Sequence, residues 1–131
     1  MEDNFKLEII SPEKIIFSDN VTMVTLPSYE GDMGVLKHHI SIITFLRPGI
    51  IKVQKNDENF INFFVQDGTV EYFNDSLIIL SASAMSIKDL SKEFLDNIAA
   101  DTQKKLDNKD LTDHDRYILN HKLDTIREVR T

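Results

Sequence analysis

The feature that most constrains the fold of this chain is the uneven distribution of its turn-forming residues. All four glycines and all three prolines lie at or before Gly68, and none follows it. The apolar segments between them are too short for ordinary helices, and turns recur roughly every 8–12 residues. This spacing predicts a mainly β structure over residues 1–86, an antiparallel β-sandwich or barrel, followed by a structure of another kind.

The densest group of turns lies in residues 27–51. Three of the glycines and two of the prolines fall there, including a tight turn at Arg47-Pro48-Gly49. No nucleophile, acid/base pair or metal-ligand cluster accompanies these turns. We interpret this stretch as a contact surface and not as a reaction centre.

Three short polar segments predict hairpins between neighbouring strands. Residues 56–59 separate two strand-like runs by a four-residue loop. Asp67-Gly68 is a strong signal for a two-residue hairpin, and Asn74-Asp75 has the same role before the apolar residues 77–80.

The strand that begins at Phe60 is predicted to be apolar on both faces. Ile61, Phe63 and Val65 point one way, and Phe60 and Phe64 point the other. One face should fill the core of the sandwich. Exposed aromatic patches seldom lack a partner, so we expect the other face to dock onto a second protein.

After the sandwich, the apolar residues follow helical spacing, which predicts two helices. Asp89 is a candidate N-cap for the first. Residues 107–110 interrupt the pattern, and Thr112 with Asp115 resembles a capping box at the start of the second. Because the joining segment is short, residues 87–131 should form an antiparallel α-helical hairpin. Its few apolar side chains would leave it marginally stable without docking.

Three arginines, Arg116, Arg127 and Arg130, border the apolar face of the second predicted helix. In one interpretation their stems cover the seam between the helices, and their charged ends pair with acids on the first helix. In the other, this face meets an acidic partner surface when the hairpin opens.

Composition and charge exclude several classes of function. The chain has no cysteine, which excludes disulfides, thiolate catalysis and thiolate metal sites. The formal net charge of −7 argues against nucleic-acid binding. No apolar run approaches the ~20 residues that span a bilayer, so we expect any membrane association to go through partners.

The remaining polar candidates do not assemble into a catalytic, metal or cofactor site. His38 and His39 are adjacent and would face opposite ways in a strand, which disfavours a shared metal ion. Glu30 and Asp32 have no nucleophile or enclosing pocket near them in the pattern, and we interpret them as surface acids. We therefore expect a chain that is not an enzyme by itself and that needs no cofactor.

The motifs along the sandwich nonetheless resemble those of a known family. They are, in order, Ile10-Ser11-Pro12, Glu30-Gly31-Asp32-Met33-Gly34-Val35-Leu36, His39 and Arg47-Pro48-Gly49-Ile50, followed by Phe64-Val65, Gly68 and Glu71. This combination resembles the epsilon subunit of bacterial F-type ATP synthases, whose mitochondrial counterpart is called delta. The resemblance covers nearly the whole chain.

The resemblance implies a sandwich of about ten strands in a noncatalytic rotor subunit of the central stalk. Such a subunit lies beside the gamma subunit on the ring of c subunits, at the cytoplasmic face of the bacterial inner membrane. It couples proton-driven rotation of the ring to ATP synthesis in the alpha/beta head. The implied c-ring contact residues are Glu30, Gly31, Asp32 and His39, which the resemblance places near one end of the sandwich. The helical tail is implied to reach the head and restrain ATP hydrolysis, and the three arginines named above are its candidate contacts.

One departure from the family pattern concerns nucleotide binding. Some members bind ATP on the tail through [IL]-D-x-x-R-A, of which this chain keeps only Asp113 and Arg116, with Tyr117 in place of the small residue. Regulatory ATP bound by Asp113 and Arg116 is therefore an open alternative. The corresponding second hypothesis is a free-standing nucleotide-sensing regulator with an ATP-responsive helical tail. Micromolar ATP binding with compaction of the tail would indicate a sensor, and millimolar or absent binding a structural subunit.

Overall fold

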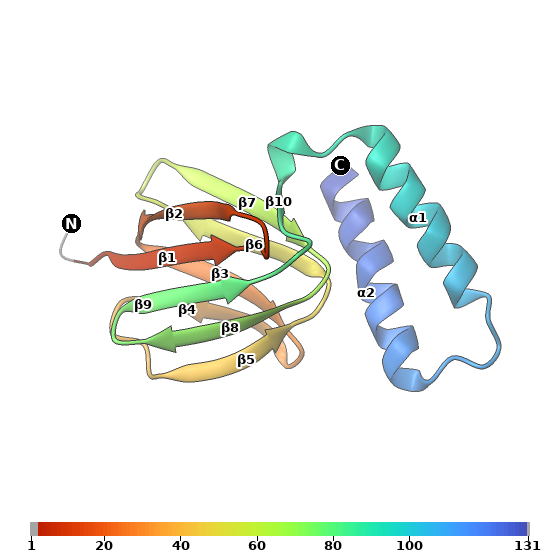
Figure 1. Ribbon diagram of the computed structural model, residues 1–131, viewed down its shortest axis with the longest axis horizontal. Coiled ribbons are helices and arrows are strands. Elements are labelled where there is room, and N and C mark those ends of the chain that lie inside the picture. The colour runs from red at the N-terminus through yellow and green to blue at the C-terminus, as the bar shows by residue number, and fades with distance from the viewer. Residues whose placement is uncertain (1–2, 131) are drawn as a thin grey trace.

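A computed structural model describes residues 3–130 as a ten-stranded β structure followed by a helical hairpin (Figure 1). The predicted bounds Met1 and Thr131 lie outside the described residues. The elements are β1 (Phe5–Ile10), β2 (Ile15–Val21), β3 (Met23–Ser28), β4 (Gly31–Val35), β5 (Ile42–Leu46), β6 (Gly49–Gln54), β7 (Phe60–Val65), β8 (Gly68–Phe73), β9 (Ser76–Leu80), β10 (Met85–Ser86), the 3₁₀ turn η1 (Ile87–Asp89), α1 (Lys92–Leu106) and α2 (Asp113–Arg130). The predicted fold class, a β-sandwich with an α-helical hairpin, is confirmed.

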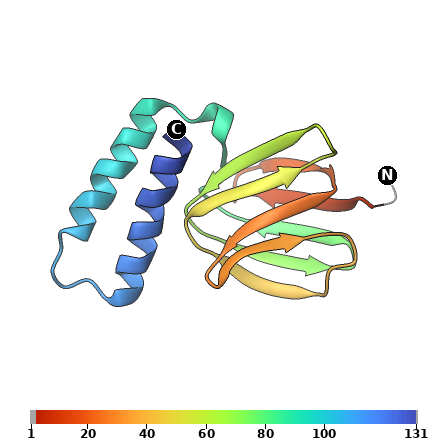
Figure 2. The ribbon, with the colours of Figure 1, turned by 180° about the vertical axis from the view of Figure 1, so that it is seen from behind.

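The strands form one continuous sheet that folds over into two layers (Figures 1 and 2). Their order is β10-β7-β6-β3-β5-β8-β9-β1-β2, with β4 paired to β3. Among the described strands, β1 and β9 run parallel and the other neighbours run antiparallel. The layers meet at β3, which pairs with β6 along three residues but with β5 only where Ser28 opposes Leu46.

The apolar residues that alternate along the strands fill the space between the layers. Their side chains are buried on the inner faces, as the period-two pattern requires. The buried core consists of Phe5, Leu7, Ile9, Val21, Val24, Leu26, Val35, Leu46, Ile51, Val53, Phe63, Val65, Val70, Tyr72, Leu77, Ile79 and Ala84. No helix within residues 3–130 is long and apolar enough to cross a membrane.

Two of the three predicted hairpins are confirmed, and the one at Asp67-Gly68 is wrong. Residues 56–59 join β6 to β7, and Asn74-Asp75 joins β8 to β9, with positive φ angles of 52° and 59° at the two turn residues. In contrast, β7 pairs with β6 and β10, whereas β8 pairs with β5 and β9. Asp67-Gly68 therefore crosses between the layers.

Close packing explains the glycine at this crossing. Gly68 opposes Leu46 in β5, and a Cβ atom at Gly68 would lie 3.0 Å from the carbonyl oxygen of Leu80. The glycine allows this close approach of backbones, and it is not there to provide the positive φ angle of a tight hairpin.

The start of the first helix differs from the prediction. Asp89 lies in η1 and is followed by extended backbone at Leu90, so it does not cap α1. The N-cap is Ser91, whose Oγ accepts a hydrogen bond of 3.0 Å from the backbone N–H of Phe94. At the second helix, Thr112 Oγ1 accepts a 3.0 Å hydrogen bond from the N–H of Asp115, which confirms the predicted cap.

The helical hairpin is joined to the sandwich by a second, smaller hydrophobic cluster. Phe64 of β7, Leu95 of α1 and Ile126 of α2 are its buried members. The outward face of β7 is therefore divided. Phe64 is covered by the chain's own hairpin, which corrects the expectation that it docks onto a second protein, while Phe60 is 60% exposed.

Candidate functional site

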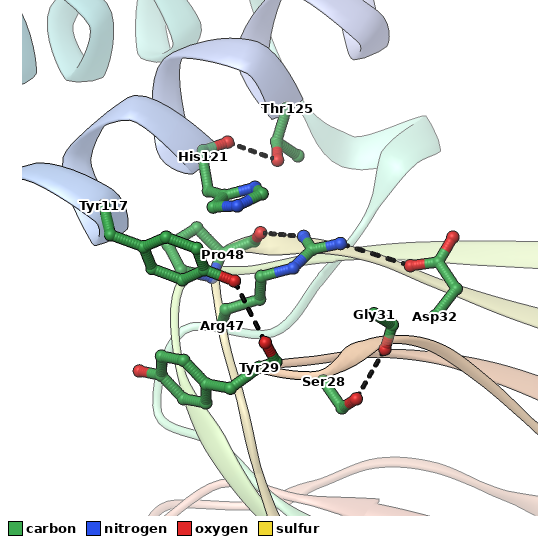
Figure 3. Close-up of polar contacts among 9 residues, drawn as sticks. All are labelled: Ser28, Tyr29, Gly31, Asp32, Arg47, Pro48, Tyr117, His121 and Thr125. Carbon is green, nitrogen blue, oxygen red and sulfur yellow. Dashed lines mark hydrogen bonds and ion pairs between the residues drawn. The ribbon is translucent and has the colours of Figure 1, made fainter. Parts of the chain in front are cut away.

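The loop singled out in the sequence forms the β3–β4 hairpin, at the end of the sandwich that faces α2 (Figures 2 and 3). Ser28 opposes Gly31 across this hairpin, and Ser28 Oγ donates a hydrogen bond to the Gly31 carbonyl. Gly31 has a φ of 117°, which other residues adopt only with strain. Glu30 is exposed at the tip and has no hydrogen-bond or ion-pair partner among residues 3–130.

Arg47 ties the β3–β4 hairpin to the β5–β6 turn. Its Nη2 atom lies 3.2 Å from Asp32 Oδ1, and its Nη1 donates a 2.8 Å hydrogen bond to the Pro48 carbonyl. Its backbone N–H donates to the Pro27 carbonyl at 3.0 Å. The Arg47 side chain is only 15% exposed, so its guanidinium is held in one place (Figure 3). Asp32 is consequently a paired acid, unlike Glu30.

Four aromatic side chains seat α2 on the β3–β4 hairpin, and we call Tyr29, His114, Tyr117 and His121 the aromatic cluster. The Tyr29 ring stacks on His114 and on Tyr117, with centroids 5.9 and 6.0 Å apart. The His121 ring meets Tyr117 edge-on at 4.4 Å. Tyr117 also donates a 3.2 Å hydrogen bond from its hydroxyl to the backbone carbonyl of Tyr29 (Figure 3). Burial, followed by the charge of Asp67, raises the pKa of Tyr29, so this residue stays neutral at physiological pH.

Replacing Tyr117 with phenylalanine should weaken the docking of α2 by about 0.5–1.5 kcal/mol, because the rings remain while one hydrogen bond is lost. Hydrogen exchange of the α2 amides measures the effect. Tyr29→Phe is a matched control, since Tyr29 contributes its carbonyl and its ring to the cluster, and neither is altered. Equal exchange rates in Tyr117→Phe and the parent chain would contradict the assignment.

His39 is not brought together with Glu30 and Asp32. It follows β4 at the opposite end of that strand, where its ring meets Tyr72 edge-on at 5.6 Å. This corrects the expectation that all the implied ring-contact residues lie near one end. His38 has a φ of 66° and lies in a turn, so the two histidines are not strand neighbours as assumed.

The turn that holds His38 is organised by Asp75, which the sequence did not single out. Asp75 Oδ1 accepts hydrogen bonds from the His38 backbone N–H at 2.8 Å and from the Tyr72 hydroxyl at 2.9 Å. These bonds, the one from His38 first, lower the pKa of Asp75. The only sequence signal for this residue was its place in the Asn74-Asp75 turn.

The predicted tail residues do not converge on a ligand site. Asp113 and Arg116 are exposed in the first turn of α2, and the Arg116 side chain has no partner among residues 3–130. Arg130 pairs with Asp96 of α1 at 2.7 Å, which confirms the seam interpretation for this arginine. Arg127 instead pairs within its own helix. The described residues hold no group of three or more side chains suited to a metal ion.

An apolar surface that the sequence analysis missed covers the outer face of β5, β8 and β9. Ile43, Phe45, Phe73 and Leu80 are between 51% and 76% exposed there. Beside it, a groove of about 800 Å³ runs from Phe45 and Leu80 to Tyr29 and His114. Runs such as Ile42 to Leu46 carry apolar groups on both faces, which was the available signal. Exposed apolar side chains gathered on one face are typical of surfaces that bind other proteins.

Comparison with known proteins places these features in context. The family described as ATP synthase, Delta/Epsilon chain, beta-sandwich domain matches residues 4–87. The ATP synthase epsilon chain of Pelagibacter ubique is 42% identical over 131 residues, covering 98% of this chain and 99% of its own length. That of Parvibaculum lavamentivorans is 33% identical, covering 99% and 98%.

Two solved structures share the fold. One is a chain of the Euglena gracilis mitochondrial ATP synthase, with a TM-score of 0.79 and 19% identity over 98% of this chain and 82% of that one. The other comes from the Tetrahymena thermophila mitochondrial ATP synthase, with a TM-score of 0.65 and 16% identity over 96% of both chains.

Proposed function

Because this chain belongs to the delta/epsilon family of ATP synthase subunits, we propose that it is a noncatalytic rotor subunit of the central stalk, coupling proton-driven rotation of the c ring to ATP synthesis in the alpha/beta head. The observation that carries the proposal is the 42% identity to a bacterial epsilon chain over 98% of this chain, which includes both the sandwich and the helical hairpin. Co-purification with the gamma subunit and the c ring tests it. Recovery of the tagged chain without either partner would refute it.

The outer apolar surface of β5, β8 and β9 is the proposed docking face for the gamma subunit. Ile43, Phe45, Phe73 and Leu80 are exposed apolar side chains on one face of the sheet, and the adjoining groove supplies a concave edge. The surface of Phe60 lies on the other layer and is isolated from this area. We therefore assign gamma to the β5–β8–β9 face and not to the face of β7, where the sequence predicted an unspecified partner.

The c-ring contact is proposed at the tip of the β3–β4 hairpin, Glu30 to Asp32. Glu30 supports this assignment best, because it is an exposed acid with no partner among the described residues, whereas Asp32 is engaged by Arg47. An unpaired acid suits recognition of polar or basic loops of a ring. His39 lies at the opposite end of β4 and would need a separate contact.

Glu30→Lys should lower the ATP-driven proton pumping of the assembled complex several-fold, since it places a cation where an acid is proposed to meet the ring. Pumping is measured by the quenching of a pH-sensitive dye in membrane vesicles. Glu58→Lys makes the same charge change at an exposed position of the β6–β7 turn and should leave pumping unaltered. Equal pumping by the two variants would argue against the ring contact.

The helical tail, residues 87–131, is proposed to be a separate unit from the sandwich, residues 1–86, and to restrain ATP hydrolysis when it leaves the sandwich for the head. Two features support a detachable tail. Few contacts join it to the sandwich, chiefly Phe64 and the aromatic cluster, and Arg116 is exposed and unpaired among the described residues. Arg127 and Arg130 would have to exchange their present acidic partners for those of the head.

In this proposal the chain is peripheral and reaches the membrane through its complex, at the cytoplasmic face of the bacterial inner membrane. The nucleotide-sensor alternative gains no support from the exposed, separate positions of Asp113 and Arg116. Titration of the free chain with ATP distinguishes the two functions.

A further inference from the structure

His121 occupies an unusual position for a titratable group. It lies on the face of α2 that meets the sandwich, is half-buried, and packs edge-on against Tyr117. Its imidazole points toward the guanidinium of Arg47 in the β5–β6 turn (Figure 3). A neutral histidine and a permanent cation thus face each other across the contact between the tail and the sandwich.

Arg47 cannot easily withdraw from this contact. Its guanidinium is held by the Pro48 carbonyl at 2.8 Å and by Asp32 at 3.2 Å, and its side chain is only 15% exposed. Protonation of His121 would therefore set two cations against each other in a partly dehydrated place, where their repulsion is weakly screened.

The other charged groups around His121 offset this repulsion only in part. Asp32 lies on the far side of the guanidinium and is already engaged by it. Asp124, one turn along α2, is 68% exposed and pairs with Arg127. Lys122 is a further neighbouring cation, and burial and then Lys105 of α1 lower its pKa.

The Tyr29 neighbour adds no charge at physiological pH. The Tyr29 phenol has a raised pKa, and the Tyr117 hydroxyl donates its proton to a backbone carbonyl. Asp124 favours a protonated His121, but its effect is smaller than the opposing effect of Arg47.

We propose that the placement of His121 facing Arg47 makes docking of the helical hairpin sensitive to acid, so that α1 and α2 stay on the sandwich at neutral pH and are released as the pH falls. The docked state holds His121 neutral, and the released state exposes it to water, where it takes up a proton freely. The consequence for the complex rests on the proposed function: in the rotor, acid would free the tail to move toward the head.

The direction of the pH effect follows from linkage. Burial, followed by the charge of Arg47, lowers the pKa of His121 below its ordinary value of 6.5, and Asp124 offsets this only in part. A group with a lowered pKa in the docked state binds fewer protons there than in the released state. Docking is therefore strongest above about pH 6.5 and weakens as the pH falls below that value, by at most about tenfold per pH unit.

The absence of cysteine allows a direct measurement on the full-length chain. Asp57→Cys in the β6–β7 turn and Lys109→Cys at the tip of the helical hairpin are exposed positions for a pair of fluorescent dyes. Energy transfer between them, followed from about pH 8 to about pH 5.5, should report a several-fold rise in the released fraction, with its onset below about pH 6.5. An unchanged transfer efficiency over this range would overturn the proposal.

Histidine variants identify the group that titrates. His121→Gln in the dye-labelled chain should abolish the pH response, whereas His114→Gln and His38→Gln should retain it. His38 lies at the opposite end of the sandwich and is 78% exposed, so it controls for histidine replacement in general. A response that persists in His121→Gln, or that disappears in His114→Gln instead, would overturn the assignment to His121.

A second measurement covers the case in which His121→Gln no longer docks at any pH. An NMR titration of the His121 ring in the parent chain should give it a pKa below the ordinary histidine value of 6.5. A pKa for His121 at or above 6.5 would overturn the proposal. Both experiments use the free chain, so their outcome is separate from whether the chain assembles with gamma and the c ring.

Discussion

Replacing Gly49 with alanine should lower the free energy of unfolding of the β-sandwich by about 3 kcal/mol or more. A Cβ atom at this position would lie 2.5 Å from Cβ and 2.9 Å from Cγ of Pro27, distances that packed carbon atoms do not tolerate. The proline ring cannot move aside, because its own carbonyl is held by the Arg47 N–H, and β3, β5 and β6 meet at this corner. Chemical denaturation of the full chain measures the effect.

Gly34→Ala is the matched control for this substitution. The nearest atom to a Cβ at Gly34 is Met23 Cε at 3.1 Å, the end of a flexible side chain that can rotate away. Gly34→Ala should therefore lower the free energy of unfolding by much less than Gly49→Ala does. Equal costs for the two variants would show that the β3–β5–β6 corner is not tightly packed.

Replacing Phe64 with alanine should remove most of the contact between the helical hairpin and the sandwich. Phe64 is completely buried against Leu95 and Ile126, and truncation of such a phenylalanine costs about 3–5 kcal/mol. The chain can limit this cost by releasing the hairpin. We therefore expect amide protection to be lost in α1 and α2 while it persists in the sandwich strands, as observed by hydrogen exchange with mass spectrometry.

Phe60→Ala provides the control on the same strand and the same face. Phe60 is 60% exposed, so its truncation should lower the free energy of unfolding by much less than the truncation of Phe64 does. If Phe64→Ala instead unfolds the sandwich together with the helices, the division into two units at residue 86 is refuted. In the assembled complex, Phe64→Ala should also lower ATP hydrolysis if the released tail restrains the head, and unaltered hydrolysis would count against that role.

The contrast between these two phenylalanines illustrates a limit of sequence reasoning. Both were predicted on one face of β7, and the sequence left open whether that face fills the core or meets a partner. The alternation of the strand determines which residues share a face, because successive side chains point in opposite directions. Which part of that face is covered depends on where residues 95 and 126 are brought, and these are far along the chain.

Strand pairing shows the same limit. The turn at Asp67-Gly68 was recognisable, but its role as a hairpin was not correct, since β7 and β8 belong to different layers. Asp-Gly is favourable in a tight hairpin and equally compatible with a crossing that needs a small residue. The deciding contact, between Gly68 and Leu80, involves a strand that comes later in the chain.

Only part of the candidate site could be predicted from the sequence. The β3–β4 turn with Glu30 and Asp32 was identified from its glycines and acids. The ion pair of Asp32 with Arg47 and the packing of Tyr117 on Tyr29 were not predicted. Arg47 is 15 positions from Asp32 in the sequence, and Tyr117 is 88 positions from Tyr29. His39 was grouped with the turn, although the five residues of β4 carry it to the other end of the strand.

The sequence by itself determined the local structure of this protein: a turn-rich β region up to residue 86, two helices after it, and the motifs of its family. These features depend on backbone preferences and side-chain periodicity within a few residues, and the chain carries that information at each position. Only the tertiary structure decided which strands are neighbours, which aromatic groups stay exposed, and that His121 faces Arg47. Those features depend on burial and charge interactions between segments that are far apart in the sequence. They are therefore decided only when the whole chain folds.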